Sequence, residues 1–91
     1  PASLTAFQLL QNQPNPALSS TLIEFNLSQA ANVQVQLLNT EGRLLKTLME
    51  GPMTAGLHGV TLYTTELAAG TYLYRLKAGD FEVTRKMVVV K

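Results

Sequence analysis

The stretch TYLYRLKAGDFEVTRKMVVVK, residues 71–91, gives the clearest evidence for the class of fold. In its first half Tyr72, Tyr74 and Leu76 alternate with other residues, so all three share one face of an extended chain. Gly79-Asp80 then supplies a two-residue hairpin turn, and a run rich in β-branched residues follows it. The stretch therefore predicts two antiparallel strands joined by a tight turn, over residues 71–77 and 81–90.

Two segments upstream of this hairpin show the same alternation, with apolar residues on one face and polar residues on the other. Because a shift of one residue would turn every side chain to the opposite face, these apolar triplets define the faces that we expect to be buried. The triplets are Ile23/Phe25/Leu27 and Val33/Val35/Leu37, in strands expected over 21–27 and 33–38, and further strands are expected over 7–11, 43–49 and 57–64.

Proline, glycine and asparagine interrupt the alternation at short intervals. Pro14-Asn15-Pro16 ends the first expected strand, because proline fixes its own φ and restricts the residue before it. The segment 39–42 is typical of a hairpin loop in which Gly42 supplies a positive φ. Two further interruptions are expected: a longer connection bracketed by Gly51-Pro52 and Ala55-Gly56, and a tight corner at 67–70.

Seven short antiparallel strands in 91 residues predict an all-β fold, an immunoglobulin-like antiparallel β-sandwich of about seven strands. The length suits a single domain, expected to span residues 1–91. The chain begins at Pro1, with no basic segment followed by an apolar one. We therefore expect a fragment of a larger secreted protein, whose own targeting signal lies upstream.

The composition excludes several classes of function. Only 14% of the residues are charged, against a usual ~25%, and the net charge of +1 comes from scattered basic residues, so nucleic-acid binding is not expected. The absence of cysteine excludes disulfides and thiolate zinc sites. No apolar stretch approaches the ~20 residues that span a bilayer, so no membrane span is expected.

The sequence contains no recognisable catalytic constellation. The sole histidine, His58, has no neighbouring Cys, Asp or Glu, and a metal site needs at least three protein ligands, so we expect a structural or surface role. Ser19 and Ser20 lack a glycine elbow and an adjacent base, which indicates a turn. The carboxylates fall mainly at turns or outward strand positions, where solubility explains them. No catalytic residue, metal site, cofactor or enzyme activity is expected.

The three tyrosines allow two interpretations. Tyr63, Tyr72 and Tyr74 could line a sugar-binding platform, because aromatic faces stack on apolar ligand surfaces. The alternation instead predicts that Tyr72 and Tyr74 belong to the core. The spacing of Leu67, Gly70 and Tyr72 also resembles a tyrosine corner, in which the phenol hydrogen-bonds back across the connection before a strand.

Six stretches, taken in order, form a pattern that covers nearly the whole chain. They are FQLLQNQPNP at 7–16, TLIEFNL at 21–27, Gly42-Arg43, AGLH at 55–58, LAAGTYLYRL at 67–76 and TRKMVVVK at 84–91. Together they resemble the type A C-terminal sorting domain of the type IX secretion system. Each stretch alone is common, whereas their order, their spacing and the terminal lysine are specific in combination.

The resemblance implies a sandwich at the end of a larger protein that a signal peptide carries to the periplasm. An outer-membrane translocon and its shuttle proteins would recognise the domain, and the cargo would cross to the cell surface or the medium. A sortase-like cysteine protease would usually remove the domain and join the cargo to an anionic lipopolysaccharide. The domain would then be a substrate and not an enzyme.

The resemblance also assigns recognition by the translocon or sortase to particular residues. Gly42 and Arg43 match the family's turn motif, and Gly70 and Tyr72 match its corner. Cleavage is expected at or before residues 1–6. The terminal signal of the family matches Lys86, Met87, Val88, Val89, Val90 and Lys91, while the chain departs from the family pattern at Asn39-Thr40 and Tyr63-Thr64.

An extended terminal segment suits recognition, because it can pair through its backbone while alternate side chains fill pockets and Lys86 and Lys91 add charged contacts. In another interpretation, Arg85, Lys86 and Lys91 only protect an edge strand from aggregation. Two other functions stay open. An accessory module that binds a carbohydrate or a surface predicts an exposed aromatic platform, and a structural immunoglobulin-like spacer would tolerate residues after Lys91.

Overall fold

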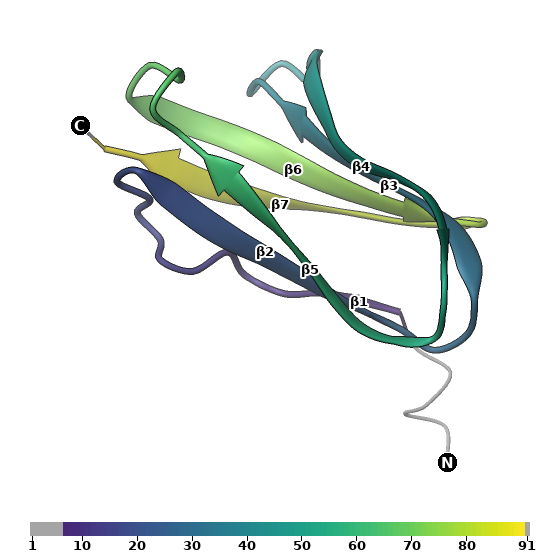
Figure 1. Ribbon diagram of the computed structural model, residues 1–91. Helices are drawn as coiled ribbons and strands as arrows, with labels where there is room; N and C mark the ends of the chain where they lie inside the picture. Colours follow the sequence, from purple (N-terminus) through teal and green to yellow (C-terminus); the bar gives the residue numbers. More distant parts are fainter. Residues whose placement is uncertain (1–6, 91) are drawn as a thin grey trace.

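The computed structural model describes residues 7–90, and these form seven strands in two antiparallel sheets (Figure 1). The three-stranded sheet has the order β1-β2-β5, and the four-stranded sheet has the order β4-β3-β6-β7. The strands are β1 (Gln8–Leu9), β2 (Ser20–Leu27), β3 (Ala31–Leu38), β4 (Leu44–Met53), β5 (Gly56–Tyr63), β6 (Gly70–Ala78) and β7 (Phe81–Val89).

The chain crosses between the sheets at the β2–β3, β4–β5 and β5–β6 connections, while β3–β4 and β6–β7 are hairpins within one sheet (Figure 1). Gly42 and Gly79 have φ values of 85° and 59° in these two hairpins, as their predicted turn roles require. The two facing antiparallel sheets are an immunoglobulin-like sandwich, so the predicted fold class is confirmed.

The core lies between the inward faces of the two sheets. The alternation predicted these faces correctly, because the triplets from β2 and β3 are all at most 2% exposed. Tyr74 and Leu76 from β6 are fully buried, whereas Tyr72, near the end of the sandwich, is half-buried. The hydrophobic cluster of buried residues consists of Leu9, Ile23, Phe25, Leu27, Val33, Val35, Leu37, Leu62, Tyr74, Leu76, Ala78, Met87 and Val89.

The connection between β4 and β5 is shorter than the sequence predicts. β4 runs on through Gly51 and Pro52 to Met53, and β5 already begins at Gly56. Proline is tolerated in this strand because β4 is an edge strand, where a missing N–H removes no ladder bond on the outer side. The predicted longer connection is therefore wrong, and only residues 54 and 55 join the two sheets here.

β4 also shows how an edge strand with several apolar residues avoids pairing with other chains. Its register against β3 shifts twice, between Val35 and Gln36 and between Leu37 and Leu38. Such bulges twist an edge strand away from a regular ladder, and Lys46 adds a charge on the same edge. These features make β4 a poor template for strand addition.

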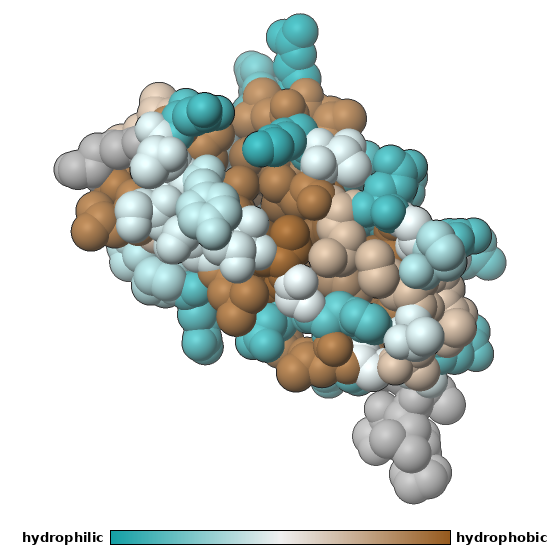
Figure 2. Space-filling model, in the orientation of Figure 1, coloured by the Kyte–Doolittle hydropathy of each residue, from teal (hydrophilic) through white to brown (hydrophobic). Residues whose placement is uncertain are grey.

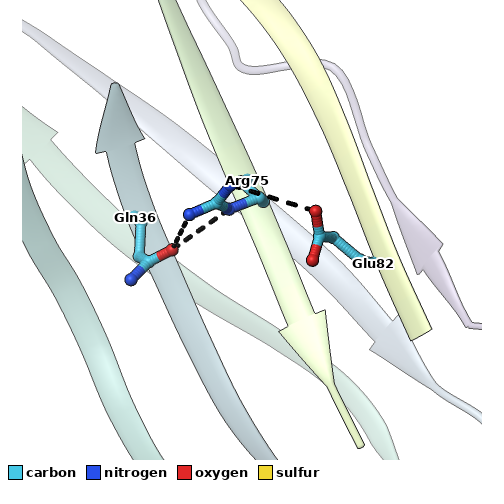
Figure 3. Close-up of polar contacts among 3 residues, drawn as sticks. All are labelled: Gln36, Arg75 and Glu82. Carbon is cyan, nitrogen blue, oxygen red and sulfur yellow. Dashed lines mark hydrogen bonds and ion pairs between the residues drawn. The ribbon is translucent and has the colours of Figure 1, made fainter. Parts of the chain in front are cut away.

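The outer faces of the two sheets differ in character. On the four-stranded sheet Arg75 lies between β3 and β7, where its Nε and Nη2 donate to Gln36 Oε1 at 3.1 and 2.7 Å and its Nη1 lies 3.9 Å from Glu82 Oε2 (Figure 3). Figure 2 shows apolar side chains gathered over β2 and β5 on the other face. Leu22 and Leu57 belong to that face and are 39% and 61% exposed.

Candidate functional site

The terminal strand β7 presents two different sets of side chains. Met87 and Val89 are buried in the core at 0% and 1% exposure. Lys86, Val88 and Val90 alternate with them and point away from the core, with Val90 39% exposed. Of the residues that the family resemblance marks as the terminal signal, these three are therefore accessible in the folded domain, and Lys91 lies outside the described residues.

The free side of β7 is covered by the segment that joins β1 to β2. We call residues 11–17 of this segment the strap. Ala17 forms a parallel bridge with Val89, in which Ala17 N donates to Val88 O at 2.7 Å and Val90 N donates to Ala17 O at 2.9 Å. In Figure 1 this segment follows β2 back to the end of the molecule where β7 finishes.

Side chains of the strap complete this cover. Asn15 Oδ1 accepts a hydrogen bond from Val88 N at 3.1 Å, and Gln11 Nε2 donates to Lys86 O at 2.9 Å. When the Ala17 bridge is included, four backbone groups on the edge of β7 that faces away from β6 have hydrogen-bond partners in the strap. They are Lys86 O, Val88 N, Val88 O and Val90 N. The side of β7 that faces away from β6 is thus not an open edge at this point.

A buried polar network holds the strap in place. The Tyr74 hydroxyl donates to Leu10 O and accepts from Asn12 N, both at 2.8 Å. Asn12 is 1% exposed, and its Nδ2 donates to Thr21 Oγ1 at 3.0 Å and to Pro14 O at 3.1 Å. Burial raises the pKa of the Tyr74 phenol, although the Asn12 N–H and the Arg85 charge act in the opposite direction.

This network explains why β1 is shorter than the strand predicted over 7–11. The Leu10 carbonyl and the Asn12 N–H turn toward the Tyr74 hydroxyl instead of β2, so the ladder stops at Leu9. It resumes as a single bridge between Gln13 and Leu22. Arg85 Nε donates to Leu9 O at 2.5 Å and joins this part of the chain to β7.

The corner before β6 has the predicted tyrosine geometry. Tyr72 Oη donates to Ala68 O at 2.7 Å, four residues back along the connection. Gly70 begins β6 with a φ of 151° and pairs with Val89 of β7. The prediction of a tyrosine corner is confirmed, and it places the corner directly beside the end of the terminal strand.

The turn that contains Gly42 and Arg43 is held by Asn39. Its Oδ1 accepts from Glu41 N and Arg43 N at 2.9 Å each, and Gly42 N donates to Asn39 O at 3.0 Å. Arg43 is exposed at the start of the return strand. One of the two positions where the chain departs from the family pattern, Asn39-Thr40, therefore still supplies the residue that builds the turn.

The topology brings the residues to which the family resemblance assigns recognition to one end of the sandwich. Leu38 at the end of β3 pairs with Leu73 of β6, which pairs with Lys86 of β7. The β3–β4 turn, the tyrosine corner and the end of β7 consequently lie at the same end of the four-stranded sheet (Figure 1). The expected cleavage region, residues 1–6, lies outside the described residues.

Other kinds of site find little support in residues 7–90. Within that range no group of three or more His, Cys, Asp or Glu could hold a metal ion, and no helix is long and apolar enough to cross a membrane. His58 has a structural role, since its ring stacks on Phe25 at 5.5 Å and its Nε2 lies 2.7 Å from Thr54 O. Tyr63 is 70% exposed on β5, whereas Tyr74 is buried, so the tyrosines do not form one platform.

The strap is the part of the site that the sequence interpretation missed. The sequence predicts only that Pro14-Asn15-Pro16 ends the first strand, because a proline-rich polar stretch has no apolar periodicity that would indicate contacts with β7. One signal was present, since Thr21 continues the inward alternation of Ile23 and marks a polar group that needs a buried partner.

Comparisons with known proteins agree with this description. Among solved structures, the crystal structure of dimeric latent PorU from Porphyromonas gingivalis is similar, with a TM-score of 0.74 and 20% sequence identity over 93% of this chain and 9% of that chain. The chain thus spans about a tenth of the length of PorU, and the likeness supports the fold. No curated protein matches the sequence.

A family model for the secretion system C-terminal sorting domain matches residues 13–90, which include most of the strap, the turn, the corner and the terminal strand up to Val90. This match covers most of the chain, and it agrees with the resemblance carried by the sequence motifs. The chain belongs to the family of secretion system C-terminal sorting domains and functions as a type IX secretion sorting signal.

Proposed function

We propose that residues 1–91 are one sorting domain at the C-terminal end of a larger secreted protein, and that they direct this cargo from the periplasm across the outer membrane. The partners would be an outer-membrane translocon and its shuttle proteins. A sortase-like cysteine protease would then remove the domain within or before residues 1–6. In this role the domain is recognised and cut by other proteins, and it performs no catalysis itself.

One observation carries this proposal: the residues that match the recognition motifs of the family gather at one end of the sandwich. Gly70 and Tyr72 lie beside the end of β7, where Lys86, Val88 and Val90 point outward, and Gly42 and Arg43 lie at the same end of the four-stranded sheet. A recognition partner could contact all of these residues from one side. An accessory carbohydrate-binding module finds less support, because Tyr63 and Tyr74 lie on different faces.

The proposal is tested by fusing residues 1–91 to a periplasm-directed reporter in a host that has the type IX secretion system. We expect the reporter at the cell surface or in the medium, without the sorting domain. The same fusion in a host without the system is the control and should stay periplasmic. Retention in the periplasm of both hosts would contradict the proposed function.

A second fusion tests the route of removal. Replacing residues 1–6 with a glycine-serine segment of equal length keeps the described sandwich intact, since that sandwich is formed by residues 7–90. We expect export to continue while release of the domain is slowed. Mass spectrometry of the exported reporter reads the cut directly, and a cut that lies after residue 6 would contradict the assigned position.

A further inference from the structure

The cover over β7 restricts how a partner can read the terminal strand. Strand addition needs a row of unpaired backbone groups on the edge of a sheet. In β7 the groups Lys86 O, Val88 N, Val88 O and Val90 N already have partners in the strap. A partner that paired with this edge would first have to break all four hydrogen bonds.

The strap is also too well anchored to be displaced readily. Ala17 is fully buried, and Asn12 is 1% exposed. Asn12 forms hydrogen bonds with Tyr74, Thr21 and Pro14, and its Oδ1 accepts a further one from Gln11 Nε2 at 2.7 Å. Every buried side-chain nitrogen or oxygen atom of residues 7–90 has a hydrogen-bond partner. Lifting the strap would leave several buried polar groups without one, which is costly.

The residue that follows the strap, Leu18, adds its side chain to the surface beside the terminal strand. Leu18 and Val90 follow the bridged residues Ala17 and Val89, and Val90 N donates to the carbonyl of Ala17, the residue directly before Leu18. Leu18 is 62% exposed and Val90 39% exposed. Val88 lies two residues before Val90 and points to the same side.

We infer that the terminal strand is read through a composite surface, the terminal patch, which consists of Leu18, Val88 and Val90 with Lys86 at its border. This inference rests on the proposed function and deepens it. The patch joins residues more than sixty positions apart in the sequence, so that both the start and the end of the domain must be folded before it exists.

The chemistry of the patch indicates its partner. The three aliphatic side chains of the patch fit an apolar pocket. Lys86 is exposed and takes no part in the Arg75–Glu82 ion pair found within residues 7–90, so its charge is available to acidic groups at the rim of such a pocket. The occupant is thus the component of the secretion machinery that recognises the domain. It offers an apolar pocket with acidic groups, and it does not add a strand.

The first test uses two leucines of equal exposure. Leu18→Glu alters the patch, while Leu57→Glu is the matched control, since Leu57 is 61% exposed and pairs with Asn26 at the opposite end of β2 from the strap. In the reporter fusion we expect Leu18→Glu to lower export by about tenfold and Leu57→Glu to leave it unchanged. Thermal unfolding of both purified domains checks that each is folded.

The outcomes separate this inference from the proposed function. If the unaltered domain exports the reporter and Leu18→Glu does so equally well, the terminal patch is not the recognition surface. The same conclusion follows if Leu57→Glu reduces export as much as Leu18→Glu. If the unaltered domain itself fails to export the reporter, the proposed function has failed instead.

A second test distinguishes the closed strap from strand addition. Ala17→Cys combined with Val89→Cys places two cysteines on bridged residues, where oxidation in the periplasm would fix the strap to β7. We expect export of the locked domain to equal that of the two single-cysteine variants. Retention of the locked domain alone would show that the strap must open, and it would overturn the inference.

Discussion

Tyr74 joins the core of the four-stranded sheet to the strap through its hydroxyl group. Tyr74→Phe keeps the ring but leaves the Asn12 N–H and the Leu10 carbonyl without this partner in a buried place. We expect the free energy of unfolding to fall by about 1–3 kcal/mol, measured by urea denaturation. Tyr63→Phe is the control, because Tyr63 is 70% exposed and should change stability by less than about 0.5 kcal/mol. Equal losses in the two variants would contradict this role.

The same residue gives the domain a dependence on alkaline pH. Burial raises the pKa of the folded Tyr74 phenol above its ordinary value of 10.0. Below pH 10 the phenol is protonated in both the folded and the unfolded chain, and its contribution to the free energy of unfolding is fully present. As the pH rises above 10, the unfolded chain loses the proton first, so stability falls until the folded pKa is passed. Urea midpoints from pH 8 to 11 should show a decline that is smaller in Tyr74→Phe.

At the scale of elements, the β3–β4 turn depends on the backbone of Gly42. Its φ is 85°, and a Cβ atom there would meet nothing within 4 Å, so any cost of substitution arises from backbone conformation alone. We expect Gly42→Ala to lower the free energy of unfolding by about 1–2 kcal/mol. Gly42→Asn should cost less, because asparagine tolerates positive φ. Chemical denaturation of both variants checks this order, and a larger loss in the asparagine variant would contradict it.

The elements also show where the sequence was sufficient and where it was not. β2, β3, β6 and β7 could be predicted because period-two alternation follows burial on one face, and each differs from its expected bounds by at most two residues at either end. β1 was also predicted as a strand, but its short length was not, since that length depends on the Tyr74 hydroxyl, which is distant in sequence. The extent of β4 depended on its place at a sheet edge, which the local pattern around Pro52 does not reveal.

For the candidate site the same division holds. The turn and the corner could be predicted from the position of Gly42 and the spacing of Gly70 and Tyr72. The strap could not, because its contacts with Val88 and Val90 arise only when both sheets have assembled. The local pattern of residues 11–17 indicates only the end of a strand at Pro14-Asn15-Pro16, whereas burial of Asn12 requires partners from β2 and β6.

At the scale of the whole molecule, β7 contributes both to the core and to the proposed recognition surface. β7 contributes Met87 and Val89 to the core and turns Lys86, Val88 and Val90 outward. The sandwich measures 42 × 23 × 18 Å, and the strap follows the long direction before it meets the end of β7. If a receptor recognises this end, as we propose, it would bind only a sorting domain that has folded, because the strap and β7 come together only in the assembled sandwich.

Removing Val90 and Lys91 separates these two roles. Val89 is the last core residue among residues 7–90, so removal of Val90 loses the hydrogen bond from Val90 N to Ala17 O, while Val90 itself is 39% exposed. We expect the free energy of unfolding to fall by only about 0.5–1.5 kcal/mol, whereas export of the reporter should be abolished. A folded tag added after Lys91 is the companion variant, because it keeps every described contact and blocks access to the terminal patch. Normal export of both variants, with unfolding transitions close to that of the intact domain, would show that the end of β7 has only a structural role.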